Sequence, residues 1–172
     1  ADIVIRINNY ATINYESDVG KKTDFVMITP AIMPNPELMK IPGHRIIAFC
    51  NDKFEYLNTA QARMNLENGC KIDLSKINII DLGLVRDLIA ILRLEDRQWP
   101  STGLLAIAWC INTFKSIDVN INLFGFSFFK ESGNRLQHYY GIETKRDKHH
   151  NFDSEEKFVL NLQEKGHVNL VA

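Results

Sequence analysis

The chain has 172 residues, of which 45% are hydrophobic and 24% charged, a composition typical of a globular protein with one sizeable core. Its formal net charge of −1 excludes a broad basic surface for nucleic acid, and no segment approaches the roughly 20 apolar residues of a membrane span. Cys50, Cys70 and Cys110 form no CxxC pair and no zinc pattern, so they are expected to be small core residues.

The first half of the chain alternates short apolar runs with polar or proline-rich connections. Residues 10–22 are polar and predict a loop, and residues 30–43 hold four of the five prolines, which predicts irregular structure. Apolar side chains at helical spacing over residues 52–68 predict a helix that Gly69 ends. Short strands are predicted at residues 2–7, 25–29, 46–49 and 77–80.

The second half continues the alternation, with longer helices. The apolar spacing predicts an amphipathic helix over 84–94 and a largely apolar, buried helix over 101–114. A last helix is predicted over 153–165, stopped by Gly166, and strands at 119–124 and 167–171. Strands alternating with helices are typical of βαβ units, so we expect one α/β domain over 1–172 with a mainly parallel sheet. Ligands of such sheets bind beyond the carboxyl ends of the strands.

The predicted start of the helix at residue 101 is the most informative local feature. Pro100 breaks the preceding chain, and Ser101, Thr102 and Gly103 follow it. The first amides of a helix have no internal partners and favour negative charge, so this end suits a phosphate or carboxylate. The alternative, which local sequence favours, is simple capping of the helix by Ser101 or Thr102.

Histidines are concentrated around His138 and at the pair His149–His150. Adjacent histidines rarely point at one ion, so the spacing does not predict a metal site. A histidine near a carboxylate suits a general base, because histidine titrates near neutral pH. The alternative for the His149–His150 pair is a polar loop without a catalytic role. Composition and spacing alone predict an α/β domain that binds an anion.

Four segments, in order, resemble the four sialyl motifs of the eukaryotic-type sialyltransferases. The first match is to the second half of the large motif and the second is to the small motif, and each of these consists of two stretches. The third and fourth matches are to the third and the very small motif. In chain order these are Asp2–Asn8 with Asp18–Thr23, Pro100–Leu105 with Leu123–Phe126, His138–Tyr140, and His150 with Glu155.

The resemblance implies a modified Rossmann-like glycosyltransferase fold, a GT-A-like variant whose mainly parallel sheet is flanked by helices. It implies transfer of sialic acid from CMP-sialic acid to a glycan or glycolipid acceptor, with inversion and without a metal. The CMP-sugar is then a substrate, and no cofactor is expected. No nucleic-acid partner is expected, and no membrane span in this chain.

The resemblance also assigns roles to individual residues. His150 would deprotonate the acceptor hydroxyl, and His138 would stabilise the departing phosphate. Glu155, about a helical turn beyond His150, would orient the His150 ring or cap the helix predicted near Asp153. The residues implied for donor binding are Asn8, Ser101, Thr102, Gly103, Gly125 and Tyr139.

The chain departs from the family pattern in several places. The strand and glycine loop that open the large motif have no counterpart before Ala1, and the cysteines of the family disulfide are not matched. Ser127 stands where a second glycine is common, and Gly141 where an acidic residue often follows. The cysteine usage favours a bacterial-like relative in the cytoplasm or on the cytoplasmic face of a membrane; a fragment of a eukaryotic enzyme would belong in the Golgi lumen.

Two alternatives to the sialyltransferase function remain open. Another CMP-linked ulosonic acid such as Kdo shares the carboxylate and phosphate chemistry of sialic acid. The chain is alternatively a non-catalytic nucleotide-binding domain derived from such an enzyme.

Overall fold

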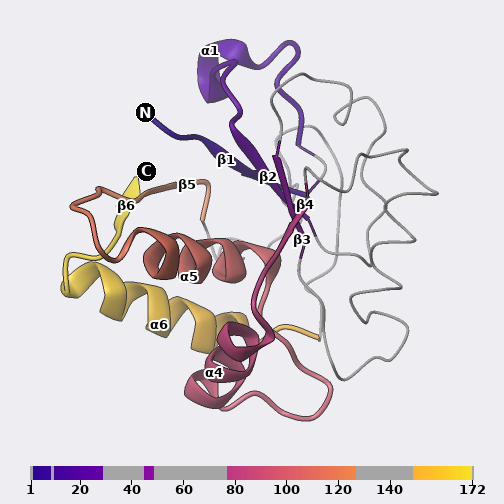
Figure 1. The fold of residues 1–172 in the computed structure, drawn as a ribbon, viewed down its shortest axis with the longest axis vertical. Helices are drawn as coiled ribbons and strands as arrows, with labels where there is room; N and C mark the ends of the chain where they lie inside the picture. The colour runs from indigo at the N-terminus through magenta and orange to yellow at the C-terminus, as the bar shows by residue number, and fades with distance from the viewer. Residues whose placement is uncertain (1, 9, 29–44, 49–76, 127–148, 172) are drawn as a thin grey trace. The chain divides into compact units, whose positions relative to one another are not determined.

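The structure is a computed structural model that describes residues 2–8, 10–28, 45–48, 77–126 and 149–171 (Figure 1). The chain divides into two compact units, Ala1–Val85 and Arg86–Ala172. A single domain over 1–172 stays a prediction. The expected helix at 52–68 and the expected irregular segment at 30–43 lie outside the described residues.

The first unit contains a four-stranded sheet in which every pairing is parallel, as predicted. Its strands are β1 (Ile5–Ile7), β2 (Phe25–Ile28), β3 (Arg45–Ala48) and β4 (Ile77–Ile79), in the order β1-β2-β3-β4. Met27 pairs with Ile7 on one side and with Ile47 on the other. The last three residues of β2 are at most 1% exposed, because an inner strand of a parallel sheet is covered on both faces.

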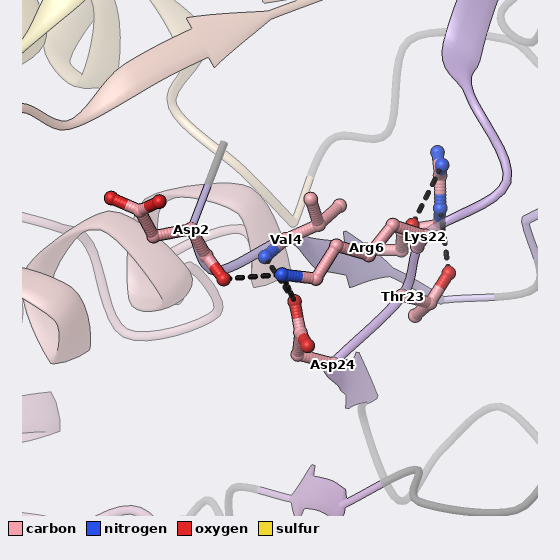
Figure 2. Close-up of polar contacts among 6 residues, drawn as sticks. All are labelled: Asp2, Val4, Arg6, Lys22, Thr23 and Asp24. Carbon is pink, nitrogen blue, oxygen red and sulfur yellow. Dashed lines mark hydrogen bonds and ion pairs between the residues drawn. The ribbon is translucent and has the colours of Figure 1, made fainter.

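Strand β1 begins three residues later than predicted, and Asp24 explains the difference. The Asp24 carboxylate accepts a hydrogen bond from the main-chain N–H of Val4 at 2.7 Å (Figure 2). A side chain therefore takes the place of the main-chain acceptor that a strand would offer to this N–H. The predicted loop at 10–22 also contains a single helical turn, α1 (Glu16–Val19). Gly20 ends that turn with φ +69°, a backbone conformation that glycine adopts without strain.

The second unit holds helices α5 (Thr102–Phe114) and α6 (Phe152–Glu164) and the parallel pair β5 (Asn122–Phe124) and β6 (Asn169–Val171). Helix α4 (Leu82–Leu92) begins in the first unit and continues into the second. The first half of α5 is buried as predicted, whereas its second half is partly exposed. None of the described helices is long and apolar enough to cross a membrane.

The end of α6 explains why β6 begins at residue 169 and not at 167. Gly166 has φ +75°, and its N–H bonds the carbonyl of Gln163 at 2.9 Å. The next N–H, of His167, bonds the carbonyl of Leu162 at 2.9 Å. These two bonds form a Schellman motif, so His167 belongs to the end of the helix and is lost to the strand.

Cys110 lies in α5 as a free thiol, and burial raises its pKa to about 11. We therefore expect it to react with iodoacetamide at pH 8 about a hundredfold more slowly than an ordinary thiol, because only the thiolate is nucleophilic. Mass spectrometry of the Cys110 peptide measures this rate, with the urea-unfolded chain as the control. Equal rates in the folded and unfolded chain would contradict the burial. Cys50 and Cys70 lie outside the described residues.

Candidate active site

Ser101 caps helix α5, as local sequence predicted. Its Oγ accepts a hydrogen bond from the N–H of Leu104 at 3.2 Å. Its own N–H and hydroxyl both donate to a single side chain, Glu155 in the first turn of α6. The N–H bonds Oε1 at 2.8 Å and the hydroxyl bonds Oε2 at 2.5 Å. One carboxylate therefore fixes the start of α5 to the start of α6.

The Glu155 carboxylate is almost fully buried, with 1% of the residue exposed. Burial raises the pKa of this carboxyl above its usual range, because the charged form loses its hydration. The two hydrogen bonds from Ser101 and the charge of His150 oppose this rise. Glu155 thus couples the cap of α5 to the charge state of His150.

The next two amides of α5 remain available for a ligand. The N–H groups of Thr102 and Gly103 make no hydrogen bond to the described residues, since they lie in the first turn, where a helix offers no carbonyl. Thr102 is buried and Gly103 partly exposed. Two amides at the positive end of a helix suit one phosphate or carboxylate group.

His150 is held by the backbone of Trp99. Its Nδ1 lies 2.9 Å from the Trp99 carbonyl oxygen. A carbonyl only accepts hydrogen bonds, so Nδ1 carries a hydrogen and Nε2 keeps its lone pair when the ring is neutral. The Trp99 N–H in turn donates to the His149 carbonyl at 2.9 Å. The contact of Nδ1 with the Trp99 carbonyl thus leaves Nε2 as the basic atom of the neutral His150 ring.

The two neighbouring histidines face Trp99 differently. The His149 ring stacks on the indole, with centroids 4.7 Å apart and planes 13° from parallel. The His150 ring meets the same indole edge-on, at 6.0 Å and 87°, and its other neighbour is Phe152 at 5.4 Å. The two adjacent rings therefore contact different faces of their surroundings, His149 by stacking and His150 by its edge.

The expected contact between Glu155 and the His150 ring is replaced by another arrangement. Both Glu155 oxygens bond Ser101, and helix α6 is capped by Asn151, whose Oδ1 accepts from the Ser154 N–H at 3.2 Å. No hydrogen bond joins Glu155 to the His150 ring among the described residues, and the charge of His150 lowers the pKa of Glu155 against the effect of burial. The residue that orients the ring is Trp99, which sequence reasoning did not single out, although it directly precedes the Pro100 break.

Asn8, in the first unit, lies just beyond the end of β1 in a left-handed conformation with φ +55°. Its N–H bonds the Met27 carbonyl at 2.7 Å, and its carbonyl accepts from the Tyr10 N–H at 3.1 Å. The side-chain Oδ1 is buried and has no hydrogen-bond partner among the described residues. Buried polar atoms are almost always paired, so this oxygen fits a ligand that supplies a donor.

The remaining predicted donor residues have separate outcomes. Gly125 directly follows β5 with φ +74°, and a Cβ added there would meet open space. Backbone conformation therefore explains this glycine. His138 and Tyr139 lie outside the described residues, and their roles stay predictions. Among the described residues, no cluster of three or more histidine, cysteine or acidic side chains is arranged to hold a metal ion.

Comparison with known proteins gives consistent results. The profile of glycosyltransferase family 29 (sialyltransferase) matches residues 1–167. A type 2 lactosamine alpha-2,3-sialyltransferase of Rattus norvegicus is 24% identical over 198 residues, covering 95% of this chain and 55% of the rat protein.

Two crystal structures of a mammalian sialyltransferase share the fold. One holds Gal-beta-1-3GalNAc-ortho-nitrophenol and matches with a TM-score of 0.72; the other matches with 0.73. Each is 19% identical and is matched over 99% of this chain and 60% of its own length. The predicted α/β glycosyltransferase fold is therefore confirmed, and the chain spans a little over half the length of these relatives.

Proposed function

Since the chain belongs to glycosyltransferase family 29, the sialyltransferases, we propose that it transfers sialic acid from CMP-sialic acid to a glycan or glycolipid hydroxyl, with inversion and without a metal. The observation that carries this proposal is the His150 ring, whose Nδ1 faces the Trp99 carbonyl. A base for an acceptor hydroxyl needs one unprotonated ring nitrogen, and the arrangement reserves Nε2 for that purpose.

The proposed reaction is an inverting displacement at the anomeric carbon of the sugar. The acceptor hydroxyl gives its proton to Nε2 of His150 while its oxygen forms a bond to the anomeric carbon of the sugar. The bond from that carbon to the CMP oxygen breaks on the opposite face, and CMP leaves with the electron pair. The buried Glu155 carboxylate favours the imidazolium that forms. His138 is proposed to stabilise the departing phosphate.

The donor-binding part of the proposal uses the polar groups that no described residue bonds, namely two amides of α5 and the Oδ1 of Asn8. The amides of Thr102 and Gly103 suit an anionic group of the donor, because they lie at the positive end of α5. The unpaired Oδ1 of Asn8 accepts a hydrogen bond from a nucleotide hydroxyl or amino group. Tyr139 and Gly125 are proposed as further donor contacts on the strength of the motif resemblance.

The hydroxyl of Ser101 is proposed to act indirectly. It already donates to Glu155 and accepts from the Leu104 N–H, so its two strongest hydrogen bonds are made within the protein. We assign Ser101 the role of fixing the amides that follow it.

The nucleotide preference is the first test. We expect CMP to bind more tightly than UMP or AMP in calorimetry, because the motif resemblance implies a CMP-linked donor. The affinity should be the same with excess EDTA as without it. Equal affinity for the three nucleotides, or loss of binding in EDTA, would contradict the donor assignment.

The alternatives differ in their products. A non-catalytic domain would bind CMP without hydrolysing CMP-sialic acid, and a Kdo transferase would prefer CMP-Kdo as donor. The rat relative is named for type 2 lactosamine, and the crystal structure contains Gal-beta-1-3GalNAc-ortho-nitrophenol, so both saccharides are the first acceptors to try. Mass spectrometry of the products from each donor separates the three possibilities.

A further inference from the structure

We infer that Arg6 is a positioning residue for the nucleotide end of the donor site. Its guanidinium fixes the turn at Val19–Thr23 and the ring of Tyr10, and through them the conformation of Asn8. This inference rests on the proposed function, because it assigns Asn8 to the nucleotide. It also explains Asp18–Thr23, the motif segment that the proposed chemistry does not use.

The guanidinium of Arg6 is bound by oxygen atoms of one turn (Figure 2). Nε donates to the Thr23 hydroxyl at 2.9 Å. Nη2 lies 2.7 Å from the carbonyl oxygen of Val19 and 3.1 Å from those of Gly20 and Lys22. A planar fork of fixed donors holds several acceptors in one geometry, which the single charge of a lysine does not.

The local backbone supplies these acceptors. Val19 ends helix α1, and the last carbonyls of a helix have no partner within it. The left-handed Gly20 then turns the chain, so that carbonyls before and after the turn converge on one cation. The turn therefore depends on Arg6, which comes from the neighbouring strand β1.

The same guanidinium reaches toward Asn8 through Tyr10. The Arg6 Cζ lies 5.3 Å from the centroid of the Tyr10 ring, and Tyr10 is 9% exposed. The Tyr10 N–H bonds the Asn8 carbonyl at 3.1 Å. Asn8 adopts φ +55°, a conformation that needs support from its neighbours, and no residue in the described ranges donates to its buried Oδ1. Loss of the Arg6 contacts therefore releases the turn that aims this oxygen.

The test measures CMP affinity and donor kinetics in Arg6→Lys, Thr23→Val and Tyr10→Leu. We expect CMP affinity to fall about tenfold in Arg6→Lys and two- to fivefold in Thr23→Val and Tyr10→Leu. The KM for CMP-sialic acid should rise by the same factors at nearly constant kcat, because ground-state binding of the nucleotide is affected. Hydrogen exchange at the Tyr10 and Gly20 amides should accelerate in Arg6→Lys.

Lys22→Ala is the matched control. Its Nζ contacts the Asp2 carbonyl and pairs with Asp24 at 3.4 Å, near the start of β1, while its carbonyl, which Arg6 uses, survives the substitution. We expect CMP affinity within twofold of the wild type in this variant. If Arg6→Lys does not fold, Thr23→Val and Tyr10→Leu still test the inference, because each removes one contact of the Arg6 guanidinium.

The outcomes separate the inference from the proposed function. If the wild-type chain does not bind CMP, the proposed function fails. If the wild type binds CMP and Asn8→Ala weakens it, while the Arg6, Thr23 and Tyr10 variants bind normally, the inference alone is overturned. If Lys22→Ala lost as much CMP affinity as Arg6→Lys, the effect of Arg6 would be a general structural one, and this result would also overturn the inference.

Discussion

Replacing His150 with alanine should lower the rate of sialic acid transfer by about 10²–10⁴-fold, the usual effect of removing a positioned general base. CMP affinity should stay unchanged, because in the proposed reaction Nε2 meets the acceptor hydroxyl and not the nucleotide. His138→Ala should behave differently, losing transfer and also CMP affinity. Single-turnover kinetics at saturating donor, together with calorimetric titration of CMP, measure the two effects.

The pH dependence provides a second measurement of the same variant. Wild-type transfer should rise with pH through a single ionisation, because a general base acts only in its unprotonated form. The His150→Ala variant should lose this rise along with most of its activity. A rise that persists in the variant would show that another group supplies the base.

His149→Ala is the internal control for His150. The side chain of His149 is exposed and stacks on Trp99, whereas its contact with the Trp99 N–H is made by a main-chain carbonyl. The substitution removes the stacked ring and leaves the main-chain carbonyl in place, so transfer should fall by less than about tenfold. A loss as large as that of His150→Ala would mean that the two histidines act jointly.

Replacing Glu155 with alanine should lower the free energy of unfolding by roughly 3–5 kcal/mol, because it leaves two donors of Ser101 without their buried acceptor. The thermal midpoint should fall by roughly 10 °C. Transfer should also fall, since the start of α5 and the segment that carries His150 lose their common anchor. Thermal unfolding followed by circular dichroism measures the first effect.

Glu155→Gln is the matched substitution. Its carbonyl oxygen still accepts from the Ser101 N–H, and its amide group still faces the Ser101 hydroxyl. The free energy of unfolding at pH 7 should lie within about 1 kcal/mol of the wild type, because hydrogen bonding is largely preserved and the buried charge is gone. A loss as large as that of Glu155→Ala would show that the charge itself is required for stability.

The raised pKa of Glu155 determines how the difference in stability between the wild type and Glu155→Gln changes with pH. The folded state binds the proton more tightly than the unfolded state, whose carboxyl titrates near 4.5. The stabilisation from protonation is therefore complete below about pH 4.5 and is lost as the pH rises through the folded value. The stability of the wild type relative to Glu155→Gln should increase as the pH falls toward 4.5. A constant difference across this range would contradict the raised pKa.

The sequence predicted the elements better than their ends. The parallel pairing and the start of α5 followed from apolar runs and from Pro100–Ser101, which are local signals. The late start of β1 depends on the Asp24 side chain and that of β6 on the turn at Gly166. Such contacts replace ladder hydrogen bonds without changing the apolar pattern, so periodicity did not reveal them.

The candidate site was predictable in its residues and not in its contacts. His150, Glu155 and Ser101 were named from the motif resemblance, and the structure brings them together in the second unit. The bond from Glu155 to Ser101 spans 54 positions, and that from His150 to Trp99 spans 51. No local rule relates residues so far apart, which is why Trp99 was missed and why Glu155 was expected to orient the His150 ring or to cap α6.

The anchor of the His150 ring has a consequence for sequence variation. Every amino acid carries a main-chain carbonyl, so the tautomer of the base does not depend on the side chain at position 99. Replacing the indole removes its ring contacts with His149 and His150, but the hydrogen bond to Nδ1 survives the substitution. Proline is the exception, because it lacks the N–H that bonds the His149 carbonyl. Trp99→Pro would therefore remove the main-chain hydrogen bond that holds the segment before His150 in place.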